Sequence, residues 1–244
     1  MKRIIGFLII LMPLFGCKEN TTESTLSGDI VGKIVLYADN GLALQDNSGI
    51  QISMEGRSFS TLSSTDGSWK LTNVPAGIYT VTFSKTGFTT RKNFNFQFVG
   101  GGTYYFGSMN LGQLPSASIT QLQFIKRDSM AFFTIQGRLS SADSLQRNIR
   151  IVFDTKPFTI SPTMTFLFWT DAAIPPDSLS FSFIYGFYDY INTSIGVSTG
   201  SKLYFRAFVL PRAGYYGNYN PANGNDEYYT TGLSFTNLDS LIVP

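Results

Sequence analysis

Five tyrosines gather near the C-terminal end of the chain, among glycine, asparagine and proline residues. They are Tyr215, Tyr216, Tyr219, Tyr228 and Tyr229. Exposed tyrosines offer flat faces on which sugar rings stack, and hydroxyls that fix the orientation of a ligand. The same composition also suits the recognition of proteins. We therefore expect a site for a glycan or a surface protein here, with tyrosines packed on a sheet as the alternative.

Oxygen-bearing side chains in the same segment could hold calcium. They are Asn220, Asn223, Asn225, Asp226 and Glu227. Their spacing does not match the loop of an EF-hand. An asparagine-rich turn is the favoured explanation, so we predict no metal site and no cofactor.

The residues available for catalysis are few, because the chain contains no histidine and one cysteine, Cys17. Ser-His-Asp and Cys-His catalysis are excluded, and so are zinc sites that need histidine or several cysteines. Carboxylate pairs remain, with Asp171, Asp189 and Asp226 as candidates. We predict that the protein is not an enzyme, with a carboxylate-dependent glycoside hydrolase or its accessory as an alternative.

The charge pattern speaks against nucleic acid as a partner. The formal net charge is +2, and it comes from Lys2 and Arg3 at the N-terminus. The remaining acidic and basic residues balance and form no basic cluster, which phosphate binding would require. Aromatic residues make up 15% of the chain and charged residues only 14%, which favours β-structure with apolar cores.

The N-terminus has the pattern of an export signal. Two basic residues precede an apolar run over residues 4–15, which is too short to span a membrane as a helix. The run ends in Leu14-Phe15-Gly16-Cys17, which resembles the lipobox of bacterial lipoproteins. The resemblance implies a signal peptide over residues 1–16 and lipid on Cys17. Residues 17–27 would then tether the protein to the lipid bilayer of the outer membrane or cell surface.

Residues 28–114 carry alternating apolar patterns that predict a first β-sandwich. Strands are expected over residues 30–37, 50–54, 69–72, 79–84, 94–98 and 104–111. The stretch from Thr65 to Leu71, followed by Asn73 to Val81, resembles the carboxypeptidase regulatory-like domain, which has a transthyretin-like fold. The resemblance places Trp69 in the core.

The motif residues of this resemblance have structural roles. Gly67 and Gly77 are expected to adopt positive φ, and Pro75 is expected to fix a loop over residues 74–77. Tyr79 is expected to pack in the core. The peptidase activity of the zinc carboxypeptidases does not carry over, because the chain has no histidine.

Residues 115–244 predict a second sandwich, with many short strands and no helical period. Strands are expected over residues 119–125, 130–136, 149–153, 166–169, 181–190 and 203–209, with 233–235 closing the sheet. Trp169 lies in an apolar run and is expected to be buried. The segment from Gly200 to Phe208 resembles the late strand of fibronectin type III-like domains, although Leu203 stands where that pattern has tyrosine.

A short motif, Asp-Ser followed by an apolar residue, occurs four times in the second domain. Its serines are Ser129, Ser144, Ser178 and Ser240. The motif resembles the O-glycosylation site of exported Bacteroidetes proteins. Ordinary turn chemistry explains it equally well, because Asp and Ser both favour turns.

Together these patterns predict an all-β chain of two sandwiches in tandem after a lipoprotein signal peptide. The expected function is that of a membrane-anchored surface lipoprotein acting as a non-catalytic binding or scaffold module. A structural subunit of a surface assembly, in which an exposed strand edge accepts a strand from a neighbour, is the alternative.

Overall fold

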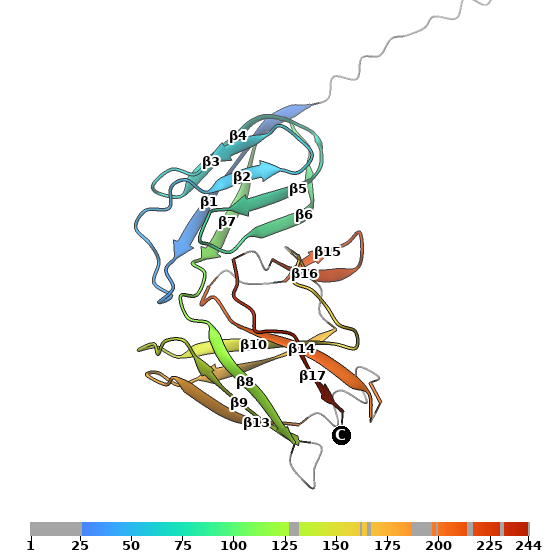
Figure 1. The fold of residues 1–244 in the computed structure, drawn as a ribbon. Helices are drawn as coiled ribbons and strands as arrows, with labels where there is room; N and C mark the ends of the chain where they lie inside the picture. Colours follow the sequence, from blue (N-terminus) through green and yellow to red (C-terminus); the bar gives the residue numbers. More distant parts are fainter. Residues whose placement is uncertain are drawn as a thin grey trace, which may run out of the picture.

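The computed structural model describes residues 26–126, 132–161, 163–164, 167–186, 197–198, 200–213, 217–229 and 232–243. These residues form strands, turns and irregular segments, so the chain is all-β, as predicted. Two β-sandwich modules follow each other along the chain (Figure 1). Within this part of the chain there is no apolar helix of a length that would cross a bilayer.

The first module consists of two sheets. Its strands are β1 (Ser27–Tyr37), β2 (Gln51–Met54), β3 (Ser60–Leu62), β4 (Ser68–Pro75), β5 (Gly77–Ser84), β6 (Arg91–Phe98) and β7 (Thr103–Gly112). One sheet has the order β4-β1-β7 and the other β3-β2-β5-β6. β1 is the central strand of its sheet and pairs antiparallel with β4 and parallel with β7.

The alternating patterns of the first module bury one side of each strand. Ile52 and Met54 of β2 are buried, and so are Trp69 and Leu71 of β4, as predicted. The Trp69 ring meets the Phe83 ring edge to face, with 5.7 Å between centroids. Side chains of the two sheets therefore pack against each other in one core.

The predicted loop over residues 74–77 is wrong. β4 continues to Pro75 and β5 begins at Gly77, and the Tyr79 hydroxyl donates a hydrogen bond to the Pro75 carbonyl at 2.7 Å. Gly67 has a φ of 81°, as expected, but Gly77 is not among the glycines with positive φ. A Cβ at Gly77 would lie 3.1 Å from Cζ of Tyr79. A larger residue at this position would therefore have to push the tyrosine ring aside by a few tenths of an ångström.

The described residues of the second module form three sheets. Its strands are β8 (Ile119–Lys126), β9 (Phe132–Leu139), β10 (Arg147–Asp154), β11 (Thr163–Met164), β12 (Phe168–Ile174), β13 (Ser180–Gly186), β14 (Lys202–Val209), β15 (Asn218–Asn220), β16 (Asn225–Tyr229) and β17 (Asp239–Ile242). The two larger sheets have the orders β13-β9-β8 and β12-β10-β14-β17, and the small one β11-β16-β15. All are antiparallel.

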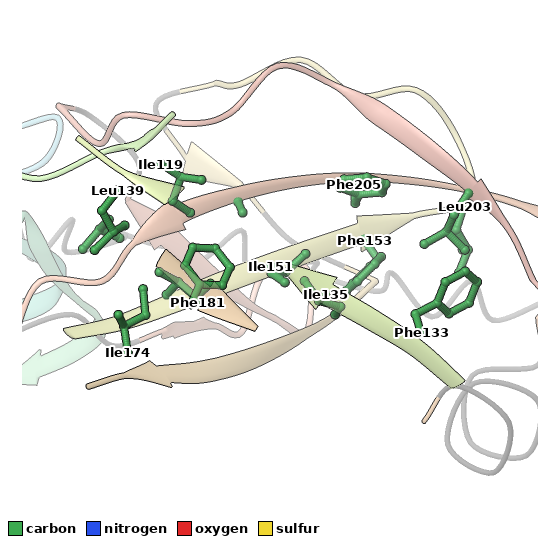
Figure 2. Packing of buried hydrophobic residues seen from close by; sticks show 14 of the residues in the cluster. Ile119, Phe133, Ile135, Leu139, Ile151, Phe153, Ile174, Phe181, Leu203 and Phe205 are labelled. Carbon is green, nitrogen blue, oxygen red and sulfur yellow. The ribbon is translucent and has the colours of Figure 1, made fainter. Parts of the chain in front are cut away.

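The core of the second module lies between its two larger sheets, where Figure 2 shows the apolar side chains gathered. Ile135 of β9 and Ile151 of β10 are fully buried. Across the core, the rings of Phe124 and Phe205 approach to 4.2 Å between centroids. Burial of this apolar surface is the main force that holds the two sheets together.

The predicted closing strand over residues 233–235 is wrong. β17 closes the sheet by pairing with β14 from Lys202 to Phe205. Phe235 makes only an isolated bridge to Phe208, and its ring packs against the Phe208 ring at 4.5 Å between centroids. The backbone at Phe235 and Thr236 therefore lies along the edge of β14 as a single bridge, and the Thr236 N–H donates to the Ala207 carbonyl at 2.9 Å.

Asp39, which follows β1, connects the two modules. Its carboxylate accepts two hydrogen bonds from Arg147, at 2.5 and 2.7 Å, and two from the backbone N–H and hydroxyl of Ser116. Arg147 also pairs with Asp143 at 2.6 Å, and Arg212 donates to the Asp39 carbonyl at 2.8 Å. We call these five residues the inter-module network. Arg147 is 3% exposed, so this polar contact is a buried one.

Candidate functional site

An exposed tryptophan lies beside a bidentate ion pair on the second module. Trp169 of β12 is 39% exposed. Arg150 of β10 donates from Nε and Nη2 to the two carboxylate oxygens of Asp171, each at 2.7 Å. The Arg150 guanidinium carbon lies 5.0 Å from the Trp169 ring centroid and 5.4 Å from that of Tyr228. We call Arg150, Trp169, Asp171 and Tyr228 the aromatic–ion cluster.

The pairing of β10 with β12 explains why these side chains meet. Arg150 lies directly opposite Asp171, and Trp169 lies two residues before Asp171 on the same face of β12. Trp169 is therefore the diagonal neighbour of Arg150, close enough for a long side chain to reach. The guanidinium stacks on the ring and holds the carboxylate at the same time, which restricts the motion of all three groups.

Tyr228 reaches the cluster from a different sheet. It belongs to β16, and its ring meets the Trp169 ring edge to face at 5.5 Å between centroids. Burial, together with the nearby carboxylates of Asp226 and Asp171, raises the pKa of the Tyr228 hydroxyl, although Arg150 opposes the shift. At 5% exposure, Tyr228 supports the back of the cluster and presents little surface to a ligand.

The accessible part of the cluster combines an aromatic surface with a hydrogen-bond acceptor. The side chain of Asp171 is 40% exposed and that of Arg150 is 12% exposed. A carboxylate has about four lone-pair positions, so Asp171 can accept hydrogen bonds from a ligand while it holds Arg150. An apolar surface beside fixed acceptors is the arrangement that binds a sugar ring, whose hydroxyls donate and whose C–H face stacks.

The predicted tyrosine site is partly corrected by the structure. Tyr219 is 61% exposed on β15, as a binding residue should be. Tyr228 is buried, so its predicted role as an exposed stacking surface is wrong. Tyr229 lies in β16 and pairs with Thr163. Tyr215 and Tyr216 lie outside the described residues.

The asparagine-rich segment forms the turn of the β15–β16 hairpin. Oδ1 of Asn220 accepts a hydrogen bond from the Ala222 N–H, and Oδ1 of Asn223 accepts one from the Asn225 N–H. Both amide groups donate to Oε1 of Glu227, at 2.7 and 3.1 Å. These contacts and the turn at residues 221–224 confirm the predicted asparagine-rich turn. In the described part of the chain, no group of three His, Cys, Asp or Glu side chains is placed to hold a metal ion.

Two of the three candidate carboxylates, Asp171 and Asp226, lie in the described residues. Asp171 is bound by Arg150, Asp226 is exposed on β16, and Asp189 lies outside the described residues. A general acid and base would have to face each other across a substrate. The observed role of Asp171 is that of an acceptor held in place by an arginine.

The four Asp-Ser motifs lie in different surroundings. Ser144 is exposed, while Ser178 and Ser240 are partly buried, and Ser129 lies outside the described residues. Oδ1 of Asp143 accepts a hydrogen bond from the Leu145 N–H, which is ordinary turn chemistry. Modification of these serines stays a prediction.

Sequence reasoning missed Trp169, although the sequence contained a usable pattern. Trp169 and Asp171 are two residues apart on one strand, so they share a face. The even-numbered residues of β12 face inward, since Ala172 packs against the core and Ile174 is buried. Because the charged Asp171 must lie on the outer face, this pattern predicts that Trp169 also points outward. The expectation that Trp169 is buried, which came from the apolar run, is wrong.

No protein-family model and no curated protein sequence matches the chain. Solved structures resemble the chain at a low level, and three of them illustrate the similarity. A candidate carbohydrate-binding protein from Bacteroides uniformis is 12% identical over 89% of this chain and 99% of its own, with a TM-score of 0.32. A DUF3823 family protein from Parabacteroides merdae is 16% identical, with the same coverage and TM-score.

The third is a type II cohesin–X-dockerin complex from Acetivibrio cellulolyticus, 18% identical with a TM-score of 0.30. That match covers 35% of this chain and 58% of the length of the other. These similarities are too weak to assign a family or a ligand. The conclusions about function therefore depend on the residues and geometry described above.

Proposed function

We propose that the protein is a non-catalytic binding module that holds a glycan on the aromatic–ion cluster. The observation that carries this proposal is the exposed face of Trp169 beside the exposed carboxylate of Asp171. The exposed part of the indole is an apolar surface on which a sugar ring can stack. A sugar would cover the indole with its C–H face and donate hydroxyls to the carboxylate.

The rigidity of the cluster favours binding. Arg150 fixes the Asp171 carboxylate with two hydrogen bonds and stacks on Trp169, and Tyr228 supports the indole from behind. These groups lose little conformational freedom when a ligand arrives, which lowers the entropic cost of association. Three of the four side chains also come from two paired strands of a sheet, which position a site more accurately than loops do.

We further propose that the chain is attached to a membrane through lipid on Cys17. The basic residues, the apolar run and the Leu14-Phe15-Gly16-Cys17 motif support it. Residues 17–27 would leave the two modules free to face the surroundings at the outer membrane or cell surface. A carboxypeptidase regulatory-like module followed by a fibronectin type III-like module is the domain assignment that we favour.

A glycan-binding experiment tests the site. Binding of wild type and Trp169→Ala to an array of plant and bacterial glycans would be compared, and the best ligand measured by calorimetry. We expect Trp169→Ala to weaken binding by about tenfold or more, since stacking on an aromatic ring is worth about 0.5–1.5 kcal/mol beyond its area. Tyr219→Ala is the control, an exposed aromatic on the neighbouring hairpin. Loss of binding in the control and not in Trp169→Ala would instead support the predicted tyrosine site.

A second candidate function is assembly with a neighbouring chain. Among the described residues, β8 pairs with β9 along one edge only. Beside its other edge lies a trough of about 520 Å³ between Ile119–Gln123 and the segment Phe235–Asp239. An added strand could bond to the free edge of β8 there. Hydrogen–deuterium exchange tests this function. Addition of a strand would slow the exchange of the β8 backbone amides in the native membrane relative to the isolated protein.

A further inference from the structure

A further carboxylate lies at the edge of the aromatic–ion cluster. Asp226 and Tyr228 are two residues apart on β16, so their side chains share one face of that strand. A Cβ at Gly217 would lie 3.0 Å from Cβ of Asp226 and 3.1 Å from the hydroxyl oxygen of Tyr228. Both side chains therefore lie against the same backbone position, which places the Asp226 carboxylate near the hydroxyl at the back of the cluster.

The charges of the site surround the Tyr228 hydroxyl. Burial is the largest cause of its raised pKa, and the carboxylates of Asp226 and Asp171 add to the shift, whereas Arg150 opposes it. The guanidinium carbon of Arg150 also lies 5.4 Å from the centroid of the Tyr228 ring. One cation and two anions are therefore gathered beside the indole of Trp169.

These charges do not balance. Arg150 gives two hydrogen bonds of 2.7 Å to Asp171, and its side chain is 12% exposed, so it has little left to offer a ligand. Asp226 is exposed, and no ion pair between residues that the structure describes includes it. The accessible part of the site therefore has one excess negative charge beside an aromatic surface.

A second arginine in the same sheet does not supply the missing charge. Arg206 lies opposite Val152, which lies opposite Trp169, so the three residues form one row across the sheet. The Arg206 guanidinium donates to the Thr236 carbonyl at 2.9 Å. Asp154 is two residues from Val152 on the same face and is the diagonal neighbour of Arg206, so this pair of charges balances separately.

We propose that Asp226 determines the specificity of the aromatic–ion cluster, so that the site takes an amino sugar and rejects acidic sugars. This inference rests on the proposed function. The C–H face of the sugar stacks on Trp169, its hydroxyls donate to Asp171, and its ammonium group lies against Asp226. A neutral sugar makes the first two contacts only. A uronic acid brings its own carboxylate towards two others of the same sign.

Nuclear magnetic resonance measures this specificity at Trp169. The chain has two tryptophans, so the ¹⁵N-labelled full-length protein gives two indole N–H resonances, and Trp169→Phe identifies the one that belongs to the site. The protein would be kept in micelles of a detergent without a sugar headgroup. The probes are the methyl glycosides of glucose, glucosamine and glucuronic acid, which share one ring and differ in one group. Each is titrated at about pH 6, where an amine of this kind is protonated and carboxylates are ionised.

We expect the glucosamine derivative to bind about fivefold more tightly than the glucose derivative, which is the effect of an exposed ion pair at the upper end of its range. The glucuronic acid derivative should bind most weakly. The preference for the amine should shrink when the ionic strength rises from about 0.01 M to about 0.1 M, because the screening length falls from about 30 Å to about 10 Å.

Matched variants attribute the preference to one residue. Asp226→Asn keeps the shape of the side chain and removes its charge, so the glucosamine and glucose derivatives should bind to this variant with equal affinity. Asp177→Asn removes one exposed charge beyond the opposite end of β12 from Trp169, and should keep the preference. Preservation of the preference in Asp226→Asn would overturn the inference.

The remaining outcomes separate this inference from the proposed function. If the three glycosides bind with equal affinity, the specificity is wrong and the glycan site survives. Nα-acetyl-lysine amide offers an ammonium group without a sugar ring, and affinity equal to that of the glucosamine derivative would reject an amino sugar as the ligand. If no glycoside moves the Trp169 resonance, both the inference and the proposed function are rejected.

Discussion

Removal of Arg147 should uncouple the two modules. Its guanidinium binds Asp39 of the first module with two hydrogen bonds and Asp143 of the second with an ion pair. The side chain of Arg147 is 3% exposed and that of Asp39 is 15% exposed, so water can replace little of what is lost. Arg147→Met keeps most of the packing volume and removes the charge.

The expected cost follows from this burial. Removing one partner of a buried ion pair costs about 3–5 kcal/mol, because the remaining charge is left uncompensated. Here Ser116 still donates two hydrogen bonds to Asp39, and Arg212 lies 3.0 Å from Asp143. These partners reduce the loss, so we expect a decrease of about 3 kcal/mol in the free energy of unfolding, at the lower end of that range.

Urea unfolding followed by tryptophan fluorescence measures this loss module by module. Trp69 reports on the first module in a Trp169→Phe background, and Trp169 reports on the second in a Trp69→Phe background. In the parent proteins we expect the two transitions to coincide, and in Arg147→Met we expect them to separate. Coincidence in both would refute the coupling.

A matched control is available in the first module. Lys33→Met removes an ion pair whose side chains are 52% and 62% exposed, and should cost far less than Arg147→Met because water screens the pair. If Arg147→Met costs no more than this control, the inter-module network does not stabilise the protein.

Three further outcomes follow from the same structure. Burial raises the pKa of Asp39, but hydrogen bonds from Arg147 and Ser116 outweigh it and leave the pKa below its ordinary value. The stabilisation by Asp39 is therefore present above about pH 4, the pKa in the unfolded chain, and is lost as the pH falls through the lower pKa of the folded protein. The melting temperature of Asp39→Asn should therefore change less with pH in this window than that of wild type. Gly32→Ala should cost about 1–3 kcal/mol, because its Cβ would overlap the buried Trp69 ring, whereas Gly102→Ala, with no atom within 4 Å, should leave the melting temperature nearly unchanged. Cys17→Ser should move the protein from the membrane fraction to the soluble fraction, and retention of the variant in the membrane would reject lipid attachment at this residue.

Part of the fold could be predicted because strand alternation is a local property. Ile52 and Met54 are buried where their period of two placed them, and Leu203, Phe205 and Ala207 of β14 are buried in the same way. Gly67 adopts the positive φ that an Asp-Gly turn requires. Each of these features depends on a few neighbouring residues, so a short window of sequence is enough to indicate it.

The candidate site required contacts between distant segments. Arg150 and Asp171 belong to strands whose pairing brings them directly opposite each other, and Tyr228 reaches them from a third strand much later in the chain. The apolar run around Trp169 suggested that this side chain was buried, because composition alone does not say which face of the strand is covered. The pairing of β10 with β12 places Trp169 on the outer face, beside Arg150 and Asp171.

By itself, the sequence determined the all-β class, the positions of most strands and the absence of histidine chemistry. Only the tertiary structure decided that β17 closes the second sheet, that Asp39 meets Arg147 across the modules, and that Trp169 faces outward beside Asp171. The reason is physical. Alternation follows from backbone geometry within one strand, whereas the register between strands, and the side chains it brings together, depends on how all the apolar faces are buried at once.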